Sequence, residues 1–300
     1  MNGKISNQKQ VSSLMRYTVS DGKEKGLDVI DCTNGKIRVL LNVSKALDIM
    51  QLYYEGQNVS FVSKNAYTPE NGNFSGRFEG GMLYTCGLDC LGVIEGYEVH
   101  GTFHTHRADV YRTECTEDKI IVEGEIANTA LFGKNLVMKR KITIEDSSVT
   151  VSDILENRGF RNEDFCLLYH VNIGYPMLDE GGRIIADVSE SIPRTAYATE
   201  KRDEQFVITE PLPCQEETCY YLKLNEKKVE YLNERIGKKL TLEFNGEELN
   251  NCILWKSMAS GDYALGIEPS TSELDDRFRY SVIGPGESKN YNIRITLSQW

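Results

Sequence analysis

The 300-residue sequence predicts an all-β fold, organised as a large sandwich or barrel. Short segments alternate apolar and polar side chains along most of the chain, which is the pattern of strands with one buried face. Turn residues such as Asn-Gly, Asp-Gly and Gly-Lys separate these segments, and long amphipathic helical patterns are scarce. Many strands joined by short turns therefore explain the sequence better than a helical architecture does.

The predicted strands follow one another along the whole chain. The alternating segments are KIRVLLNVS (36–44), QNVSFVS (57–63), DKIIVEGEIA (118–127), NLVMKRKITI (135–144), SVTVSDILEN (148–157), KKLTLEFNG (238–246) and NYNIRITLSQW (290–300). ALDIMQLYYEG (46–56) also fits a helical turn, but its isoleucine and tyrosines favour a strand at least as well. Residues 194–219 carry the weakest strand pattern, and we expect them to cross the sheet as a long excursion. No repeat of fixed period and no low-complexity linker divides the chain, which predicts one domain over residues 1–300.

The charge balance limits the class of ligand. Asp and Glu outnumber Lys and Arg, which gives a net charge of −11 and a pI near 5.0. Such a surface does not attract nucleic acid or an anionic membrane, and we expect neither as a partner. A neutral small molecule suits it better than a polyanion.

The cysteines and the N-terminus bear on the compartment. The eight cysteines are scattered and form no Cys-x-x-Cys pair, so the spacings of zinc sites are absent. A chain of this size needs no disulfide scaffold, so we expect reduced thiols. The first residues, MNGKISNQKQ, contain no apolar signal core, and no run approaches the length of a membrane span. These features predict a cytoplasmic protein.

One histidine stands in the middle of an apolar strand. The stretch CLLYHVNIGYP (166–176) is rich in aromatic and β-branched residues and carries His170 at its centre. A polar imidazole in such surroundings must find a hydrogen-bond partner or do chemical work. From this stretch alone, a hydrogen-bonded core histidine and a functional histidine are both open.

The other three histidines, His100, His104 and His106, fall in the stretch HGTFHTH. If this stretch is a strand, their even spacing puts all three on one face, where imidazoles suit a transition metal. A cupin-type metal site needs a glutamate shortly after the second histidine, but Asp109 comes too early and Glu114 too late. We therefore expect no metal, and we expect His104 and His106 to be solvated or hydrogen-bonded at a strand edge.

A carboxylate near the C-terminus is the next candidate. In ALGIEPSTS (264–272), Glu268 shares a strand face with the small residues Gly266 and Ala264. Small neighbours leave room for a ligand above a sheet. The other interpretation is an exposed carboxylate at a strand end.

The glycine-rich stretch GRFEGGMLYTCGLDCLG (76–92) is not a phosphate loop, because no Gly-Lys-Ser/Thr follows. Its glycines instead allow a sharp turn or a close approach of the backbone to a ligand. Arg77 and Asp89 are the polar side chains that it presents.

Taken together, these stretches resemble the aldose 1-epimerase (galactose mutarotase-like) superfamily. HGTFH, LLYHVNIGYP and WKSMASGDYALGIEPSTS occur in the family's order, and GGMLYTCGLDCLG resembles its divergent, largely uncharacterised branch. The similarity runs from about Gly76 to the C-terminus and more loosely over the first quarter. It implies a large antiparallel β-sandwich, the supersandwich, with a sugar cleft on its concave face and no cofactor.

The resemblance also implies a reaction. Members of the superfamily interconvert the α and β anomers of a free aldose through acid–base ring opening. Matched by motif, His170 is the general acid, Glu268 is the general base, and His100 is a second histidine at the cleft. We expect His170 and Glu268 to face one cleft from different strands, about 5–8 Å apart, so that a sugar ring fits between them.

Sugar binding falls, by the same resemblance, to Arg77, Asp89 and Lys256. A phosphorylated or sulfonated sugar also remains open, because the few basic residues near the predicted cleft include Arg107 and Arg140 as well.

Two other functions stay open. One is a carbohydrate-binding sandwich without catalysis, which would not need His100, His170 and Glu268 together. The other is a different carbohydrate-active enzyme on the same fold. A glycosidase uses two carboxylates, and the sequence nominates only Glu268.

Overall fold

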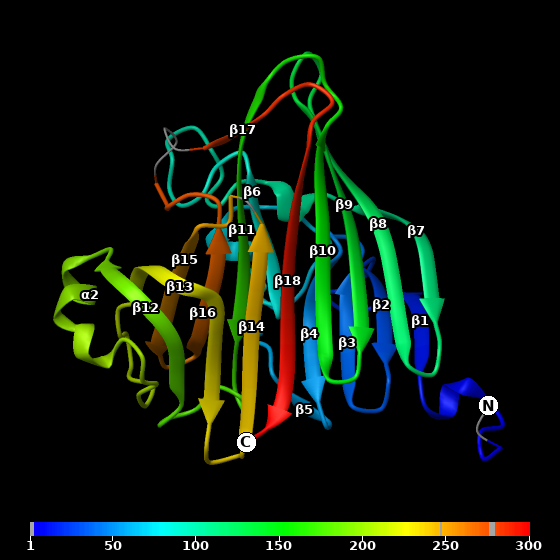
Figure 1. Ribbon diagram of the computed structural model, residues 1–300, viewed down its shortest axis with the longest axis horizontal. Coiled ribbons are helices and arrows are strands. Elements are labelled where there is room, and N and C mark those ends of the chain that lie inside the picture. Colours follow the sequence, from blue (N-terminus) through cyan, green and yellow to red (C-terminus); the bar gives the residue numbers. More distant parts are fainter. Residues whose placement is uncertain (1–2, 247, 276–279) are drawn as a thin grey trace.

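The chain folds into two antiparallel β-sheets with a few short helices at their edges (Figure 1). The computed structural model describes residues 3–246, 248–275 and 280–300. The smaller sheet comes from the N-terminal part of the chain and runs in sequence order. Its strands are β1 (Ser13–Thr18), β2 (Asp28–Thr33), β3 (Ile37–Asn42), β4 (Asp48–Tyr54) and β5 (Gln57–Asn58).

The larger sheet contains the other described strands. Its main path has the order β17-β11-β16-β15-β13-β14-β18-β10-β9-β8-β7, while β6 pairs with β11 and β12 pairs with β13. These strands are β6 (Leu83–Leu88), β7 (Ala108–Cys115), β8 (Lys119–Thr129), β9 (Asn135–Glu145), β10 (Ser148–Asn157), β11 (Glu163–Ile173), β12 (Arg183–Pro193), β13 (Thr218–Asn233), β14 (Lys238–Gly246), β15 (Asn251–Ala259), β16 (Asp262–Ser270), β17 (Ser281–Ile283) and β18 (Ser288–Gln299).

The two sheets pack against each other through the buried side chains of strands that alternate buried and exposed residues. In β10, Val149, Val151 and Leu155 are buried, whereas Ile154 between them is exposed. The buried residues of β8–β10 and β18 share one apolar core with buried residues of the smaller sheet, such as Leu41. The smaller sheet, blue in Figure 1, lies beside the β7–β10 end of the larger one.

Near the other end of the larger sheet, strands are buried on both faces. From Phe165 to Ile173, every residue of β11 is buried, so this strand is almost continuously apolar. One face joins the main core, and the other contributes Cys166 and Leu168 to a second apolar cluster with Ile253 of β15. This second face carries the cavity described below.

The helices are few and short. Those within the described residues are η1 (Gln8–Gln10), α1 (Phe74–Arg77), η2 (Phe103–Thr105), α2 (Ala196–Glu200) and η3 (Arg202–Glu204). In the described part of the chain, no helix has the length and apolar character that crossing a membrane requires. None of the eight cysteines forms a disulfide.

Most of the predicted strands are confirmed, including the ambiguous stretch 46–56, which forms β4. The predicted strand over 57–63 is shorter, because only β5 is regular and the chain continues through isolated bridges at Ser60 and Val62. The excursion over 194–219 is also confirmed, since it holds α2 and η3 before β13 begins.

The stretch HGTFHTH is not a strand, so the predicted common face of its three histidines is wrong. His100 and Gly101 both have positive φ angles, 62° and 74°, and η2 follows. A Cβ on Gly101 would lie 2.4 Å from the carbonyl oxygen of Gly87, so only glycine allows the backbone to turn this tightly. The contact with Gly87 is distant in sequence, and the even histidine spacing does not reveal it.

Candidate active site

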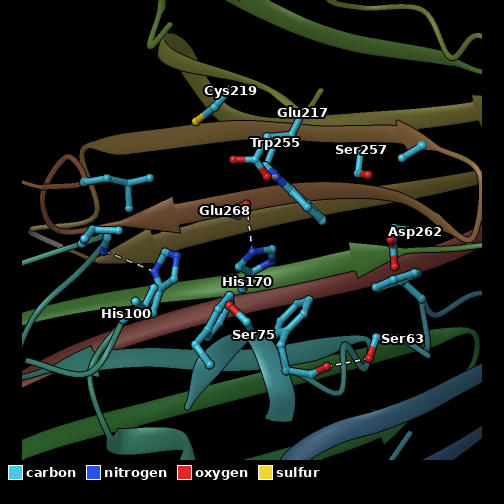
Figure 2. Close-up of a pocket in the computed structure, with 18 of the residues that line it drawn as sticks. Ser63, Ser75, His100, His170, Glu217, Cys219, Trp255, Ser257, Asp262 and Glu268 are labelled. Carbon is cyan, nitrogen blue, oxygen red and sulfur yellow. Dashed lines mark hydrogen bonds and ion pairs between the residues drawn. The ribbon is translucent and has the colours of Figure 1, made fainter. Parts of the chain in front are cut away.

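A cavity of about 570 Å³ opens on the larger sheet where β11, β16 and β15 run side by side (Figure 2). His170, Glu268 and Trp255 project into it from these three strands. The chain segments that follow β5, β6 and β12 complete its walls. Its volume is in the range of small-molecule sites.

His170 and Glu268, called the cavity pair below, come together because their strands pair. Leu168 pairs with Ser270 and Asn172 pairs with Gly266, which puts the cavity pair directly opposite each other on one face. The Nε2 atom of the imidazole lies 3.2 Å from Oε1 of the carboxyl group. The expected separation of about 5–8 Å is therefore wrong, since side chains of directly opposed residues touch.

The contact within the cavity pair leaves hydrogen-bonding capacity open. Oε1 of Glu268 is within ion-pair distance of His170, but it has no hydrogen bond of acceptable geometry, and neither does Nδ1 of the imidazole. Both residues are nearly buried: 5% of the surface of His170 and 2% of the surface of Glu268 is exposed. Buried polar atoms without partners are rare in native proteins, so these two point to a ligand or ordered water.

Gly266 lets the cavity pair and Trp255 pack closely together. A Cβ at this position would lie 2.6 Å from Oε1 of Glu268 and 3.1 Å from both His170 and Trp255. The φ angle of Gly266 is not positive, so space and not backbone conformation requires glycine here. Neither Gly266 nor Ala264 lines the cavity, so the room predicted for a ligand above these small residues is taken up by the side chains of Glu268, His170 and Trp255.

Aromatic rings enclose the His170 imidazole. The centroids of Phe78 and Trp255 each lie 5.5 Å from its centroid, and that of His100 lies 6.2 Å away (Figure 2). The rings of Trp255 and His100 meet it edge to face, with interplanar angles of 74° and 75°. The imidazole is thereby held in one orientation and shielded from water.

Burial favours the uncharged forms of both members of the cavity pair. It lowers the pKa of His170 to about 3, with a smaller effect of the neighbouring His100 in the same direction. Burial also raises the pKa of Glu268 well above its usual range, and the charge of Glu217 adds to this. Burial therefore favours a neutral imidazole and a protonated carboxyl group, so the proton of the pair is favoured on Glu268.

His100 also lines the cavity, from the loop after β6. The backbone N–H of Gly92 donates to its Nδ1 atom at 3.4 Å, which leaves the ring proton on Nε2. Burial, and to a smaller extent the nearby Arg194, lower the pKa of His100 to about 4. His100 is therefore a neutral imidazole with one N–H to offer.

Within residues 3–246, 248–275 and 280–300, two cations line the cavity, and each is paired with a carboxylate. Arg194 donates from Nη2 and Nε to one oxygen of Asp275, at 2.5 and 3.2 Å. Lys64 donates to Asp262 at 2.7 Å, and both of these side chains are well exposed. Since each of these two positive charges has a negative neighbour, neither is free to bind a phosphate group.

Arg77 and Asp89, expected to bind sugar, do not line this cavity. Arg77 ends α1 and donates to Glu70 at 2.8 Å. Asp89 forms an ion pair with Lys134 beside a separate, shallower pocket.

Lys256 also lies away from the cavity, because its neighbours Trp255 and Ser257 face it and strand residues alternate. Its ammonium group donates to the backbone oxygens of Glu204 and Val207, at 2.5 and 2.8 Å. Burial lowers the pKa of Lys256 to about 8. The side chain holds the 194–219 segment against the back of β15.

His104 is not solvated, contrary to expectation, but buried with its ring stacked on Tyr84 at a centroid distance of 4.4 Å. Its Nδ1 atom has no hydrogen-bond partner, and neither has Nε2 of the half-buried His106. Within the part of the chain that the structure describes, no three His, Cys, Asp or Glu side chains are grouped so that they could hold a metal ion.

The structure adds cavity residues that sequence reasoning missed. Arg194 and Glu217 come from the excursion 194–219, whose sequence carries no motif. Trp255 could have been found by strand parity, since it sits opposite Gly266 in the pairing of β15 with β16. Its N–H donates to Glu217 at 2.7 Å.

The sequence matches one family over nearly its whole length. The chain belongs to the DUF4432 family. The match covers residues 24–297, and the family is described as a domain of unknown function. No curated protein matches the chain in sequence.

Solved structures identify the fold. A candidate aldose 1-epimerase from Klebsiella pneumoniae subsp. pneumoniae superposes with a TM-score of 0.87 at 20% identity, over 95% of this chain and 83% of that one. A galactose mutarotase-like protein from Clostridium acetobutylicum gives 0.75 at 14% identity, over 97% and 100%. A galactose mutarotase related enzyme from Lactobacillus acidophilus gives 0.62 at 13% identity, over 95% and 98%. The fold is thus the galactose mutarotase-like β-sandwich, as the sequence motifs predict.

Proposed function

We propose that this protein is an aldose 1-epimerase that interconverts the α and β anomers of an uncharged aldose. The observation that carries the proposal is the cavity pair, in which an imidazole nitrogen and a carboxyl oxygen lie 3.2 Å apart. Ring opening needs one group that accepts the proton of the anomeric hydroxyl and one that protonates the ring oxygen. An imidazole and a carboxyl group that hold one proton between them supply both.

The steps balance without any other reactant. The base takes the proton from the anomeric oxygen, the C1–O5 bond breaks, and the acid gives its proton to O5. The resulting aldehyde rotates about C1–C2, and O5 then attacks its other face while the two protons return. The cavity pair ends with the single proton that it held at the start.

The position of that proton assigns the first step. Because burial favours an unprotonated His170 and a protonated Glu268, we assign His170 as the first base and Glu268 as the first acid. This reverses the roles that the family resemblance implies. Ring closure runs the same transfers backwards, so each group serves once as acid and once as base in every cycle.

Two further features support an uncharged sugar as the substrate. The neutral imidazole of His100 can donate its Nε2–H to a hydroxyl or aldehyde oxygen. Arg194 and Lys64 already have carboxylate partners, so a phosphate or carboxylate on the sugar would compete with Asp275 and Asp262. Neutral hydroxyls meet no such competition.

Anomer exchange measured by NMR tests the proposal over a panel of free hexoses, pentoses and acidic sugars. We expect faster exchange than in buffer for at least one neutral sugar. His170→Asn, purified in the same way, should lose this activity, while His106→Asn, outside the cavity, should keep it. If no panel sugar exchanges faster, or if His170→Asn is as active as the wild type, the proposal is wrong.

Glycoside hydrolysis is a second candidate, because the cavity contains carboxylates that the sequence did not nominate. Glu217 and Asp262 line it together with Glu268. A glycosidase uses two such groups on either side of the scissile bond. Release of the aryl group from nitrophenyl glycosides measures this activity, and it would favour hydrolysis if it exceeded anomer exchange and depended on Glu217.

A further inference from the structure

Trp255 has an unusual place in the cavity. It is one of only two tryptophans in the chain, and its indole ring lies in the wall rather than in the core. Figure 2 shows the ring extending over the cavity beside His170. A large aromatic ring that is partly open to a cavity has apolar surface that a ligand would cover.

Three contacts fix the indole ring. Its N–H donates to the exposed carboxylate of Glu217 at 2.7 Å, which stops rotation about the side-chain bonds. It meets the His170 imidazole edge to face, with centroids 5.5 Å apart. Beneath it, Gly266 has no side chain, and a Cβ there would lie 3.1 Å from Cε3 of the ring. The ring is therefore rigid before any ligand binds, which lowers the entropy cost of binding.

From these contacts we infer that Trp255 is the stacking platform for the sugar. One face of an aldose ring carries mainly C–H groups, and such a face packs on an aromatic ring while the hydroxyls point elsewhere. With the sugar on Trp255, its anomeric carbon lies next to the cavity pair. Trp255 thus positions the substrate and takes no proton. This inference rests on the proposed function.

Substitutions separate positioning from chemistry. Trp255→Phe keeps an aromatic face but loses area and the tether to Glu217, so KM should rise by about tenfold while kcat changes little; tenfold corresponds to about 1.4 kcal/mol. Trp300→Phe, outside the cavity, is the matched control and should keep the KM of the wild type. Equal losses of kcat and kcat/KM in Trp255→Phe, or an unchanged KM, would overturn the platform role.

Fluorescence tests the platform without any use of activity. The other tryptophan, Trp300, lies at the exposed C-terminus, near Lys239 and outside the cavity. In Trp300→Phe, Trp255 becomes the sole tryptophan reporter. We expect D-galactose, D-glucose or another neutral sugar of the panel to change its emission saturably, and the reciprocal variant Trp255→Phe to lose that signal.

Different results would reject the Trp255 platform and the epimerase activity. A sugar that changes Trp255 emission but never exchanges anomers faster than in buffer would leave the platform standing and reject the epimerase. A sugar that the protein anomerises without any change in Trp255 emission would reject the platform and keep the epimerase. No saturable change with any panel sugar also overturns the platform.

Discussion

Tyr169 and His170 are neighbours in β11, yet they face two buried polar environments of opposite kind. On the side packed against the smaller sheet, the Tyr169 hydroxyl donates to Asp153 at 2.7 Å, and Asp153 is paired with Arg140. On the other side, His170 faces the cavity and Glu268. One strand therefore carries a structural cluster on one face and the cavity pair on the other.

The structural cluster uses its hydrogen-bonding capacity fully. The Arg140 guanidinium donates to Asp153, to Asp48, to Thr85 and to the backbone oxygen of Ala46. Asp48 and Thr85 come from β4 and β6, so the guanidinium ties the smaller sheet to the larger one. Arg140 is therefore not a cleft residue, although the sequence left that open. Arg107 does not line the cavity either, and it pairs with Asp28.

The difference shows how to separate structure from function among buried polar groups. A network with every donor and acceptor satisfied holds elements together and leaves nothing for a ligand. The cavity pair instead keeps a nitrogen and an oxygen without hydrogen bonds beside an open cavity. A substitution in the Arg140 cluster should therefore change stability, and a substitution in the cavity pair should change activity.

The largest effect expected is on catalysis. Glu268→Gln should slow anomer exchange by about 10²–10⁴-fold, or about 3–5 kcal/mol of barrier, because an amide cannot exchange the proton. Exchange NMR measures this, with Glu243→Gln on the exposed side of β14 as the matched control. Wild-type exchange rates in Glu268→Gln would show that the base and acid lie elsewhere.

The same variant has a stability signature whose sign is fixed by the raised pKa of Glu268. The fold binds this proton more tightly than the unfolded chain does, so the wild type loses stability as pH rises from about 4.5 through the folded-state pKa. Glu268→Gln removes that loss. Urea denaturation over this range should therefore show the variant gaining stability relative to the wild type as pH rises, and a relative loss would contradict the burial argument.

On the structural side, Arg140→Met should lower the free energy of unfolding by about 3–5 kcal/mol, because it leaves two buried carboxylates without their cation. Arg158→Met is the matched control, since Arg158 pairs with Glu125 at the surface and should matter by about 0–1 kcal/mol. Urea denaturation compares the two. Similar losses in both variants would refute the structural role of the cluster.

Tyr169→Phe should have a smaller effect, about 1.5–3 kcal/mol of unfolding free energy, because it removes one hydrogen bond to a charged group. It should leave anomer exchange nearly unchanged. His170→Asn, at the next residue, should do the opposite: it should abolish anomer exchange with little loss of unfolding free energy. Parallel urea and exchange measurements decide this, and a large loss of exchange in Tyr169→Phe would mean that the two faces are coupled.

The smallest effect expected is on the pH dependence of the rate. The cavity pair gains a second proton only near the His170 pKa of about 3, and it loses its proton only above the raised pKa of Glu268. The exchange rate should therefore vary little as pH falls through 6.5. A fall with a midpoint near 6.5 would mean that an ordinary histidine controls the reaction.

The strands and site residues that depend on a local sequence pattern could be predicted from the sequence. Alternation marks β8, β9, β10, β14 and β18, because each has one buried and one polar face. The motifs also located His170 and Glu268 and the small residue Gly266. Contact between the two ionisable groups depends on the pairing of β11 with β16, which are far apart in sequence, so pattern alone gave the wrong distance.

The placement of the other candidate residues could not be predicted, because it also depends on contacts between segments that are distant in sequence. Arg77 ends a helix of one turn and Asp89 follows β6, and at such positions the direction of a side chain is set by contacts with other segments. Lys256 faces away from the cavity by strand parity, which motif matching did not consider. Arg194 and Glu217 belong to an irregular segment without periodicity, as many functional residues do.

The titration of the His170 imidazole tests the central claim most directly. NMR of the ring resonances, with His170→Asn for assignment and the urea-unfolded chain as reference, follows its protonation without a substrate. The account predicts that His170 stays neutral through pH 6.5, where the unfolded chain titrates, and takes up a proton only near 3. An imidazole that is protonated at neutral pH would contradict the account, because the shared proton would then lie on His170 and not on Glu268.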